Sequence, residues 1–280
     1  MSLMAHFLGI APNLTWRWIW LVAASFLAGV LNAVAGGGSF LSFPAMMGMG
    51  ILPVQANATN TVAIWPGQLT SIAAYRDEVR RNLTLAWIMG LAGLIGGTAG
   101  AIVLLVTPQK TFLHLVPWLL LVAASIFAVS GPVSRWLERR QGSRSGSRNG
   151  SQMGSTAGAI HAPRRIPIFI ATVVVCFYIG YFGAGAGFLI ITLLSLFGYQ
   201  DLNTINALKV VATTLANGIA FTIFIVDGQV VWRYCLAAMI AAAIGGYASA
   251  SVARHIPQRV LRLSVVVIGL GMAAWFFVKQ

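Results

Sequence analysis

The sequence predicts an all-α polytopic membrane protein made of two homologous halves, each with four to five membrane segments. Three observations lead to this prediction. Of the 280 residues, 58% are hydrophobic and 8% are charged, which does not fit an ordinary soluble domain. Uncharged apolar runs of the length that crosses a bilayer, about 20 residues, recur along the chain. Motifs of the first half return in the second half at a nearly constant spacing.

Eight long apolar runs predict spanning helices at residues 18–35, 57–75, 83–106, 112–132, 167–184, 204–226, 234–253 and 260–278. Two shorter runs, 39–52 and 187–199, are flanked by glycine, and we expect re-entrant or broken helices there. The first run lacks a basic segment and a cleavage site before it, which predicts a retained span and not a signal peptide.

The middle of the chain is rich in Ser, Gly and Arg and cannot bury enough apolar surface to fold. We therefore predict a first membrane repeat over residues 1–134, a basic linker over 135–165 and a second membrane repeat over 166–280. The net charge is +13, and seven of the 18 basic residues lie in this linker: Arg135, Arg139, Arg140, Arg144, Arg148, Arg164 and Arg165. Positively charged loops stay on the cytoplasmic side, so the charge predicts a cytoplasmic linker and needs no nucleic-acid partner.

The repeat spacing is 149 residues over most of the chain and 148 residues upstream. It pairs Asn57-Ala58 with Asn206-Ala207, and Gly96-Gly97 with Gly245-Gly246. If the short runs cross, each half has five crossings, the halves are inverted, and 14 of 18 basic residues lie inside. If they do not cross, the halves are parallel and 13 lie inside. The basic cluster at residues 254–262 occupies a short loop, and this favours inversion.

Two glycine-rich turns, residues 35–39 and 183–187, open the short segments. A helix that restarts after such a break points free N–H groups and the positive end of its dipole into the membrane. Two such ends near the midplane would suit a small anion in an alternating-access transporter. The candidate residues are Gly36, Gly37, Gly38, Ser39, Gly185 and Gly187. The alternative is close helix packing through small residues, as the spacings Gly93-xxx-Gly97 and Gly96-xxx-Gly100 indicate elsewhere.

Polar side chains inside apolar spans tend to line cavities or to pair with one another. Asn32 precedes the first glycine run, and one helix in each half is unusually polar. Its candidate residues are Asn57, Thr59, Asn60 and Gln68 in the first half, and Asn206, Lys209, Thr213 and Asn217 in the second. The second set falls on one helical face, which predicts a lined pathway. Hydrogen bonding between helices is the alternative.

Apart from Arg262, which lies at the start of the last run, Lys209 is the one formal charge placed inside a predicted span. It either supplies a positive charge for an anion or extends its ammonium group to the membrane surface. The five carboxylates all lie in loops or at span ends, which disfavours a proton relay through carboxylates.

No catalytic or metal-binding pattern is found in the sequence. The four histidines are scattered, the two cysteines are isolated in apolar runs, and no hydrolase or nucleotide-binding motif is present. We therefore expect no enzyme activity, no metal site, no disulfide and no cofactor.

The glycine run Gly36-Gly37-Gly38-Ser39, followed by Pro44, Gly50, Pro53 and residues 56–60, resembles the TauE/SafE family of bacterial sulfite exporters and sulfonate permeases. The matching second-half motifs, at residues 183–188 and at Asn206-Ala207, extend the resemblance to the second half. It implies a permease in the bacterial inner membrane for a small sulfur-containing anion, exported by some members and imported by others, with proton coupling the usual expectation. The long arginine-rich linker and the two alanines within the second glycine run depart from the family pattern.

The predicted function is therefore a secondary transporter that moves a small anion, such as sulfite or an organosulfonate, by alternating access. One alternative is an anion channel. Another is a membrane scaffold or assembly factor that docks through the basic linker. The expected partners are the anionic solute and the lipid bilayer, and the oligomeric state is left open, with a homodimer as one possibility.

Overall fold

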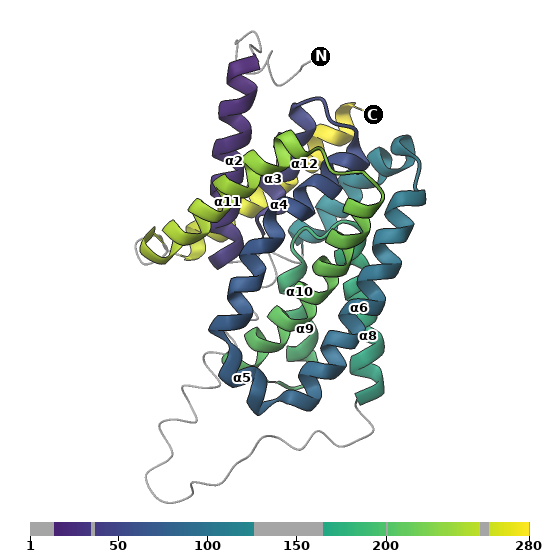
Figure 1. The fold of residues 1–280 in the computed structure, drawn as a ribbon, viewed down its shortest axis with the longest axis vertical. Helices are drawn as coiled ribbons and strands as arrows, with labels where there is room; N and C mark the ends of the chain where they lie inside the picture. Colours follow the sequence, from purple (N-terminus) through teal and green to yellow (C-terminus); the bar gives the residue numbers. More distant parts are fainter. Residues whose placement is uncertain (1–13, 35–36, 126–164, 200, 253–257, 280) are drawn as a thin grey trace, which may run out of the picture.

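The computed structural model describes residues 14–34, 37–125, 165–199, 201–252 and 258–279 (Figure 1). Every regular element in these ranges is a helix, and none of these residues forms a strand. The helices are α2 (Leu14–Val34), α3 (Ser39–Gly48), α4 (Pro53–Ala74), α5 (Arg76–Arg81), α6 (Leu83–Val106), α8 (Arg165–Tyr181), α9 (Ala186–Leu196), α10 (Leu202–Val226), α11 (Trp232–Val252) and α12 (Gln258–Lys279). Residues 109–125 are also helical.

These helices confirm the predicted all-α membrane protein. Among the described residues, three helical segments are both long enough and apolar enough to cross a membrane: Leu14–Asn32, Leu83–Val106 and Leu202–Val226. The described part of each of the ten apolar runs overlaps a helix. The number of crossings stays a prediction. The predicted linker lies outside the described residues, except for Arg165, which begins α8.

The short helix α5 was not predicted. It consists of six residues, Arg76–Arg81, and all but one of them are charged. Its first turn carries Asp77 and Glu78, and its last turn carries Arg80 and Arg81, so the charges complement the helix dipole at both ends. Arg76 and Asp77 form an ion pair at 3.8 Å, but both side chains are well exposed and the pair adds little stability.

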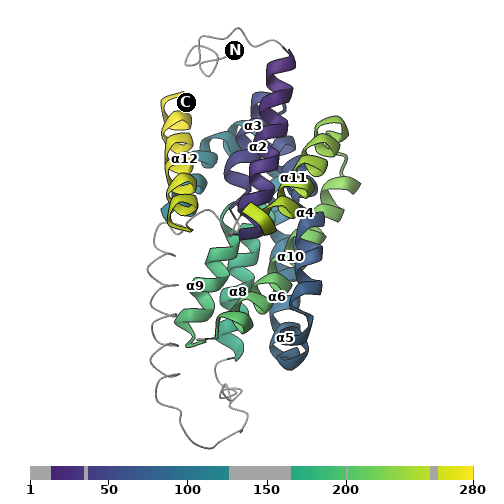
Figure 2. The same ribbon diagram turned by 90° about the vertical axis from the view of Figure 1, so that its left-hand side faces the viewer.

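The two short helices lie in opposite halves of the molecule. α2 runs from the upper end in Figure 1 to the middle, and α3 lies beside it in the upper half. α8 runs from the lower end to the middle, and α9 lies beside it in the lower half (Figures 1 and 2). The glycine-rich turns between these helices therefore lie at the middle level. α4 and α10 pass side by side close to them.

Glycine lets α6 pack very closely on two neighbours. A Cβ on Gly97 would lie 2.5 Å from the carbonyl oxygen of Ala216 in α10. On another face of α6, a Cβ on Gly100 would lie 2.1 Å from the carbonyl oxygen of Phe177 in α8. Both distances are shorter than any real contact to a Cβ atom, so these positions require glycine. The small-residue spacings of α6 are thus helix-packing motifs.

The pair formed by α2 and α11 packs in the same way. A Cβ on Gly245 of α11 would lie 2.0 Å from the carbonyl oxygen of Phe26, and one on Gly29 of α2 would lie 2.0 Å from that of Ala242. Gly245 is the repeat partner of Gly96 in α6, whose added Cβ would lie 2.4 Å from the carbonyl oxygen of Val173 in α8. The first helix of each half thus packs against a helix of the other half, α2 against α11 and α8 against α6.

Helix α10 begins with a side-chain cap. The backbone N–H groups of Asn203 and Thr204 donate to the two carboxylate oxygens of Asp201, at 3.4 and 2.9 Å. Burial pushes the pKa of Asp201 upward, but the hydrogen bonds from Thr204 and Asn203 outweigh it and the pKa is lowered. The cap therefore fixes the start of the helix that carries most of the polar residues of the second half.

Replacing Gly97 with alanine should destabilise the protein by about 1–3 kcal/mol, because the added methyl group overpacks the contact with α10. Thermal unfolding in mild detergent measures this effect. Gly48→Ala is the matched control, because a Cβ there meets nothing within 4 Å. Equal melting temperatures for the two variants would contradict the packing assigned to α6.

Replacing Asp201 with alanine should cost about 1 kcal/mol at neutral pH, since two N–H groups lose their acceptor. The folded-state pKa is lowered, so this stabilisation is complete above the unfolded-state value, about 3.9, and is lost as the pH falls through the folded-state pKa. Unfolding measured against pH should show the difference between wild type and variant shrinking in acid. Asn203→Ala, which keeps the backbone donor, is the control.

Candidate functional site

The first glycine turn leads directly into α3. Gly37, Gly38 and Ser39 are buried. A Cβ on Gly38 would lie 2.3 Å from the carbonyl oxygen of Ala28 and 3.2 Å from the Cβ of Asn32, so α3 begins tight against the last turns of α2. α3 has no side-chain cap at its start. The N–H groups of Phe40 and Leu41 donate to the carbonyl oxygens of Gly37 and Gly38, which leaves the N–H of Ser39 without an acceptor among the described residues.

The second glycine turn has a left-handed backbone. Gly183 and Gly185 have φ values of 74° and 71°, which side chains on L-residues rarely tolerate. The buried hydroxyl of Tyr178 donates to the carbonyl oxygen of Ala184 at 2.9 Å and holds the turn to the end of α8. Gly185 is the N-cap residue of α9, which begins at Ala186, again without a side-chain cap, and Gly187 follows in its first turn.

The two turns lie next to each other. A Cβ on Gly185 would lie 3.5 Å from the ring of Phe40, which belongs to the first turn of α3, and 3.4 Å from the Cβ of Ala123. The ring of Phe40 therefore links the first turn of α3 to the glycine that precedes α9. We call residues 37–39 together with 183–185 the glycine junction.

Helix α4 contacts both sides of the glycine junction through two asparagines. The side-chain amide of Asn57 donates to the carbonyl oxygen of Tyr181, the last residue of α8, at 3.0 Å. The hydroxyl of Ser42 in α3 donates to the amide oxygen of Asn60. Both asparagines are 1% exposed. The side-chain oxygen of Asn57, Oδ1, is also buried, but it has no hydrogen-bond partner among the described residues.

Helix α10 reaches the second glycine turn through Asn217. A Cβ on Gly183 would lie 3.8 Å from Asn217 Oδ1. The amide nitrogen of Asn217 donates to Oε1 of Gln68 in α4 at 3.0 Å, which joins the two polar helices. One turn earlier, the indole N–H of Trp65 donates to the carbonyl oxygen of Thr214 at 3.0 Å.

The remaining polar residues of α10 form a separate group. Lys209 is half-buried, and its ammonium group donates to the amide oxygen of Asn206 at 3.0 Å. The hydroxyl of Thr213 donates to the carbonyl oxygen of Lys209 at 2.9 Å. Lys209 precedes Asn217 by two turns, about 12 Å along the helix. The structure therefore places Lys209 on the same helix as Asn217, which contacts the glycine junction, but two turns nearer the start of α10.

Three further predicted residues lie apart from these hydrogen bonds or outside the described residues. The hydroxyl of Thr59 accepts a hydrogen bond from the backbone N–H of Val231 at 3.0 Å, which fixes the start of α11 to α4. Asn32 is half-buried in the last turn of α2, beside Gly38. Gly36 lies outside the described residues.

Sequence reasoning missed Ser42, Trp65, Tyr178 and Tyr181. Ser42 and Tyr178 sit within apolar helices and carry no pattern of their own. Tyr181 contributes a main-chain oxygen, which no side-chain motif reports. Trp65 had a usable signal, because it matches Thr214 at the same 149-residue spacing as the other repeat pairs.

The glycine junction combines uncapped N–H groups with neutral amide side chains. Groups of this kind can donate hydrogen bonds to a small anion. No group of three or more His, Cys, Asp or Glu side chains that could hold a metal ion occurs in the part of the chain that the structure describes. The polar groups that the junction offers are backbone and side-chain amides.

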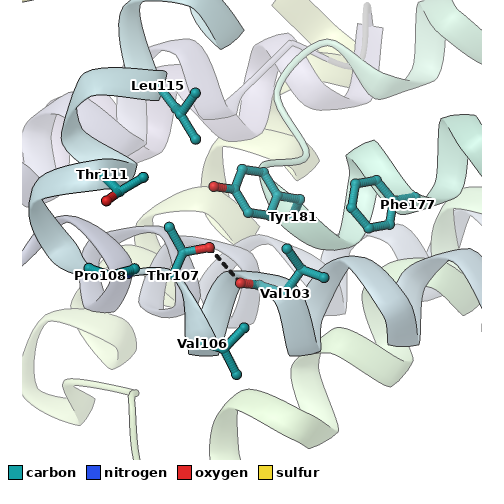
Figure 3. A pocket seen from close by; sticks show the side chains of 8 residues that line it. All are labelled: Val103, Val106, Thr107, Pro108, Thr111, Leu115, Phe177 and Tyr181. Atoms are coloured by element: carbon teal, nitrogen blue, oxygen red, sulfur yellow. Dashed lines mark hydrogen bonds between the residues drawn. The ribbon is translucent and has the colours of Figure 1, made fainter.

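A separate pocket lies between the end of α6, the helix at 109–125 and α8 (Figure 3). It has a volume of about 420 Å³, and its lining is mostly apolar, with Val103, Val106 and Phe177 among the residues that form it. The hydroxyl of Thr107 is already used, because it donates to the carbonyl oxygen of Val103 at 2.6 Å. None of its lining residues carries a formal charge. The pocket does not suit an anion.

Comparisons with known proteins cover nearly the whole chain. Residues 21–276 match the family model described as "Sulfite exporter TauE/SafE". "Probable membrane transporter protein ORF9" of Sinorhizobium sp. is 24% identical over 262 residues, which cover 90% of this chain and 89% of that protein. A "Probable membrane transporter protein" of Haemophilus influenzae is 23% identical, covering 91% and 92%. "Probable membrane transporter protein YfcA" of Escherichia coli is 24% identical, covering 91% and 87%.

No solved structure matches the chain significantly. The family model, in contrast, begins within α2 and ends within α12, so it includes both glycine turns and both polar helices. The protein belongs to the sulfite exporter TauE/SafE family.

Proposed function

We propose that this protein is a secondary transporter that moves a small anion across the bacterial inner membrane by alternating access. The single observation that carries the proposal is the glycine junction, where the uncapped starts of α3 and α9 meet beside the polar helices α4 and α10. Two helix N-termini in a membrane interior favour negative charge, and an interior site reached from either side in turn is what a transporter requires.

The proposed substrate is sulfite or an organosulfonate. Membership of the TauE/SafE family supports this class, and the curated relatives are named as membrane transporters. Sulfonyl and sulfite oxygens accept hydrogen bonds, so backbone N–H groups and the amides of Asn57, Asn60 and Asn217 provide suitable partners. The remaining candidates, Asn32, Gly36, Thr59, Gln68, Gly187, Asn206 and Thr213, border the junction or the route to it in this proposal.

In the proposed path, Lys209 attracts the anion toward the glycine junction. It is half-buried in α10, and its nearest polar partner is the neutral amide of Asn206, so its positive charge is not cancelled by a carboxylate in the described hydrogen bonds. A charge held in low-dielectric surroundings acts more strongly on an anion than one in water. The α9–α10 side would therefore be one entrance.

We further propose that the two halves are inverted repeats. α2 and α8 enter from opposite ends (Figure 1), which supports inversion. Gln68 contacts Asn217, and Trp65 contacts Thr214, although each pair is separated by 149 residues, the repeat spacing. A residue can touch its own repeat partner only near the axis that relates the halves. These contacts support an axis between α4 and α10, with the linker on the cytoplasmic side.

The binding step is tested by thermal unfolding of the purified protein in mild detergent with millimolar sulfite, sulfate, thiosulfate, sulfoacetate, taurine or acetate. A bound anion raises the melting temperature by mass action. We expect Lys209→Met to weaken binding by about tenfold or more, because a positive charge on the path is lost.

Lys110→Met is the matched control, because it removes an exposed lysine distant in sequence from the polar helices. Equal shifts for the two variants would contradict the role of Lys209. The absence of a shift with any of the anions would contradict the proposed substrate class.

A further inference from the structure

The carboxyl end of α8 presents free carbonyl oxygens to the interior. The N–H groups of Phe182 and Gly183 both donate to the carbonyl oxygen of Tyr178, at 2.9 and 3.1 Å. The carbonyl groups of Ile179 and Gly180 are consequently left without a backbone donor among the described residues. Such oxygens at a helix C-terminus carry partial negative charge and favour a cation.

Asn57 adds a side-chain oxygen to this helix end. Its amide nitrogen donates to the carbonyl oxygen of Tyr181, so Oδ1 must be the atom that remains free, because the reversed amide would place two oxygens together. The side chain is 1% exposed, and Oδ1 has no hydrogen-bond partner among the described residues. A buried acceptor without a partner costs free energy unless a ligand satisfies it.

Further oxygens border the same helix end. The point that a Cβ on Gly183 would occupy lies 3.1 Å from the carbonyl oxygen of Ile179 and 3.8 Å from Asn217 Oδ1. The glycine keeps this space free of a side chain. The surroundings of the α8 terminus are therefore rich in neutral oxygen acceptors.

In the other half, the equivalent side-chain oxygen, that of the repeat partner of Asn57, has a hydrogen-bond donor. Asn206 matches Asn57 at the 149-residue spacing, and its Oδ1 accepts from the ammonium group of Lys209 at 3.0 Å. The repeat partner of Lys209 is Asn60, which is neutral and accepts from Ser42. One half thus supplies its own cation beside the asparagine, and the other half supplies none.

From this difference we infer that Na⁺ binds at the carboxyl end of α8, with Asn57 Oδ1 as its side-chain ligand and the free carbonyl oxygens of the last turn as its main-chain ligands. Broken helices bind Na⁺ through such carbonyl oxygens in membrane transporters. The inference rests on the proposed function in one respect, since it makes Na⁺ the ion coupled to the anion. The anion would bind at the starts of α3 and α9, beside the cation.

The test measures thermal unfolding of the full-length protein in detergent, without any substrate anion, as NaCl replaces choline chloride or KCl at constant ionic strength. We expect a saturable rise of the melting temperature with Na⁺ and no rise with K⁺ or choline. The same melting temperature in all three salts would overturn the inference, and this arm needs no variant.

Two variants locate the ion. Asn57→Ala should lose the Na⁺-dependent shift, whereas Asn206→Ala, the matched repeat position whose oxygen is already paired with Lys209, should keep it. Asn60→Lys should also lose the shift, because a tethered ammonium group would then occupy the cation position as it does in the other half. Retention of the full shift in a folded Asn57→Ala protein would overturn the site.

Transport separates this inference from the proposed function. Anion counterflow in Na⁺-free buffer together with no Na⁺ shift would retain the transporter and reject the sodium site. Na⁺ binding that depends on Asn57, combined with no anion movement, would retain the site and reject the anion transporter.

Discussion

The structure depends on one constraint, the need to satisfy backbone polar groups wherever a helix breaks inside an apolar environment. α2 and α8 both end at the middle of the molecule, where no water is expected to complete their hydrogen bonds. The second break is secured by the hydroxyl of Tyr178, which donates to the carbonyl oxygen of Ala184 in the turn, and by the amide of Asn57, which donates to that of Tyr181 at the end of α8. These bonds explain why a polar helix must pass beside each glycine turn. The groups left unsatisfied there are the ones available to ligands.

Close packing through glycine makes this arrangement possible. α6 approaches α8 and α10 at Gly100 and Gly97 so closely that a single methyl group would collide with a neighbouring backbone. The corresponding contact of α11 with α2 uses Gly245. Between helices in lipid, where apolar burial gives little driving force, such contacts supply the packing energy. They leave α4 and α10 to carry polar side chains at the centre. Glycine therefore serves two separate purposes, packing in α6 and α11 and chain breakage at residues 183–185.

Much of this organisation could be predicted from the sequence, because apolar length and glycine spacing report directly on membrane helices. The short segments that became α3 and α9, and the polarity of α4 and α10, follow from local composition. The partners of the polar residues could not be predicted. Asn57 bonds to a main-chain oxygen of Tyr181, 124 residues away, and such an acceptor leaves no mark on the sequence. Lys209 donates to Asn206 on its own helix, two turns before Asn217, and the sequence pattern does not report this partner. α5 was missed because a segment of six residues, five of them charged, between two spans resembles an ordinary loop.

Counterflow in proteoliposomes tests the central claim most directly. Vesicles are loaded with unlabelled sulfite, or with whichever anion raises the melting temperature, and uptake of the labelled anion is followed after dilution. An alternating-access transporter returns to the outside faster when its inward-facing site is occupied, so we predict faster uptake and transient accumulation in loaded vesicles than in empty ones. Uptake that is unaffected by internal anion and does not saturate would indicate a channel. The absence of protein-dependent uptake would contradict the assignment of the glycine junction as a transport site.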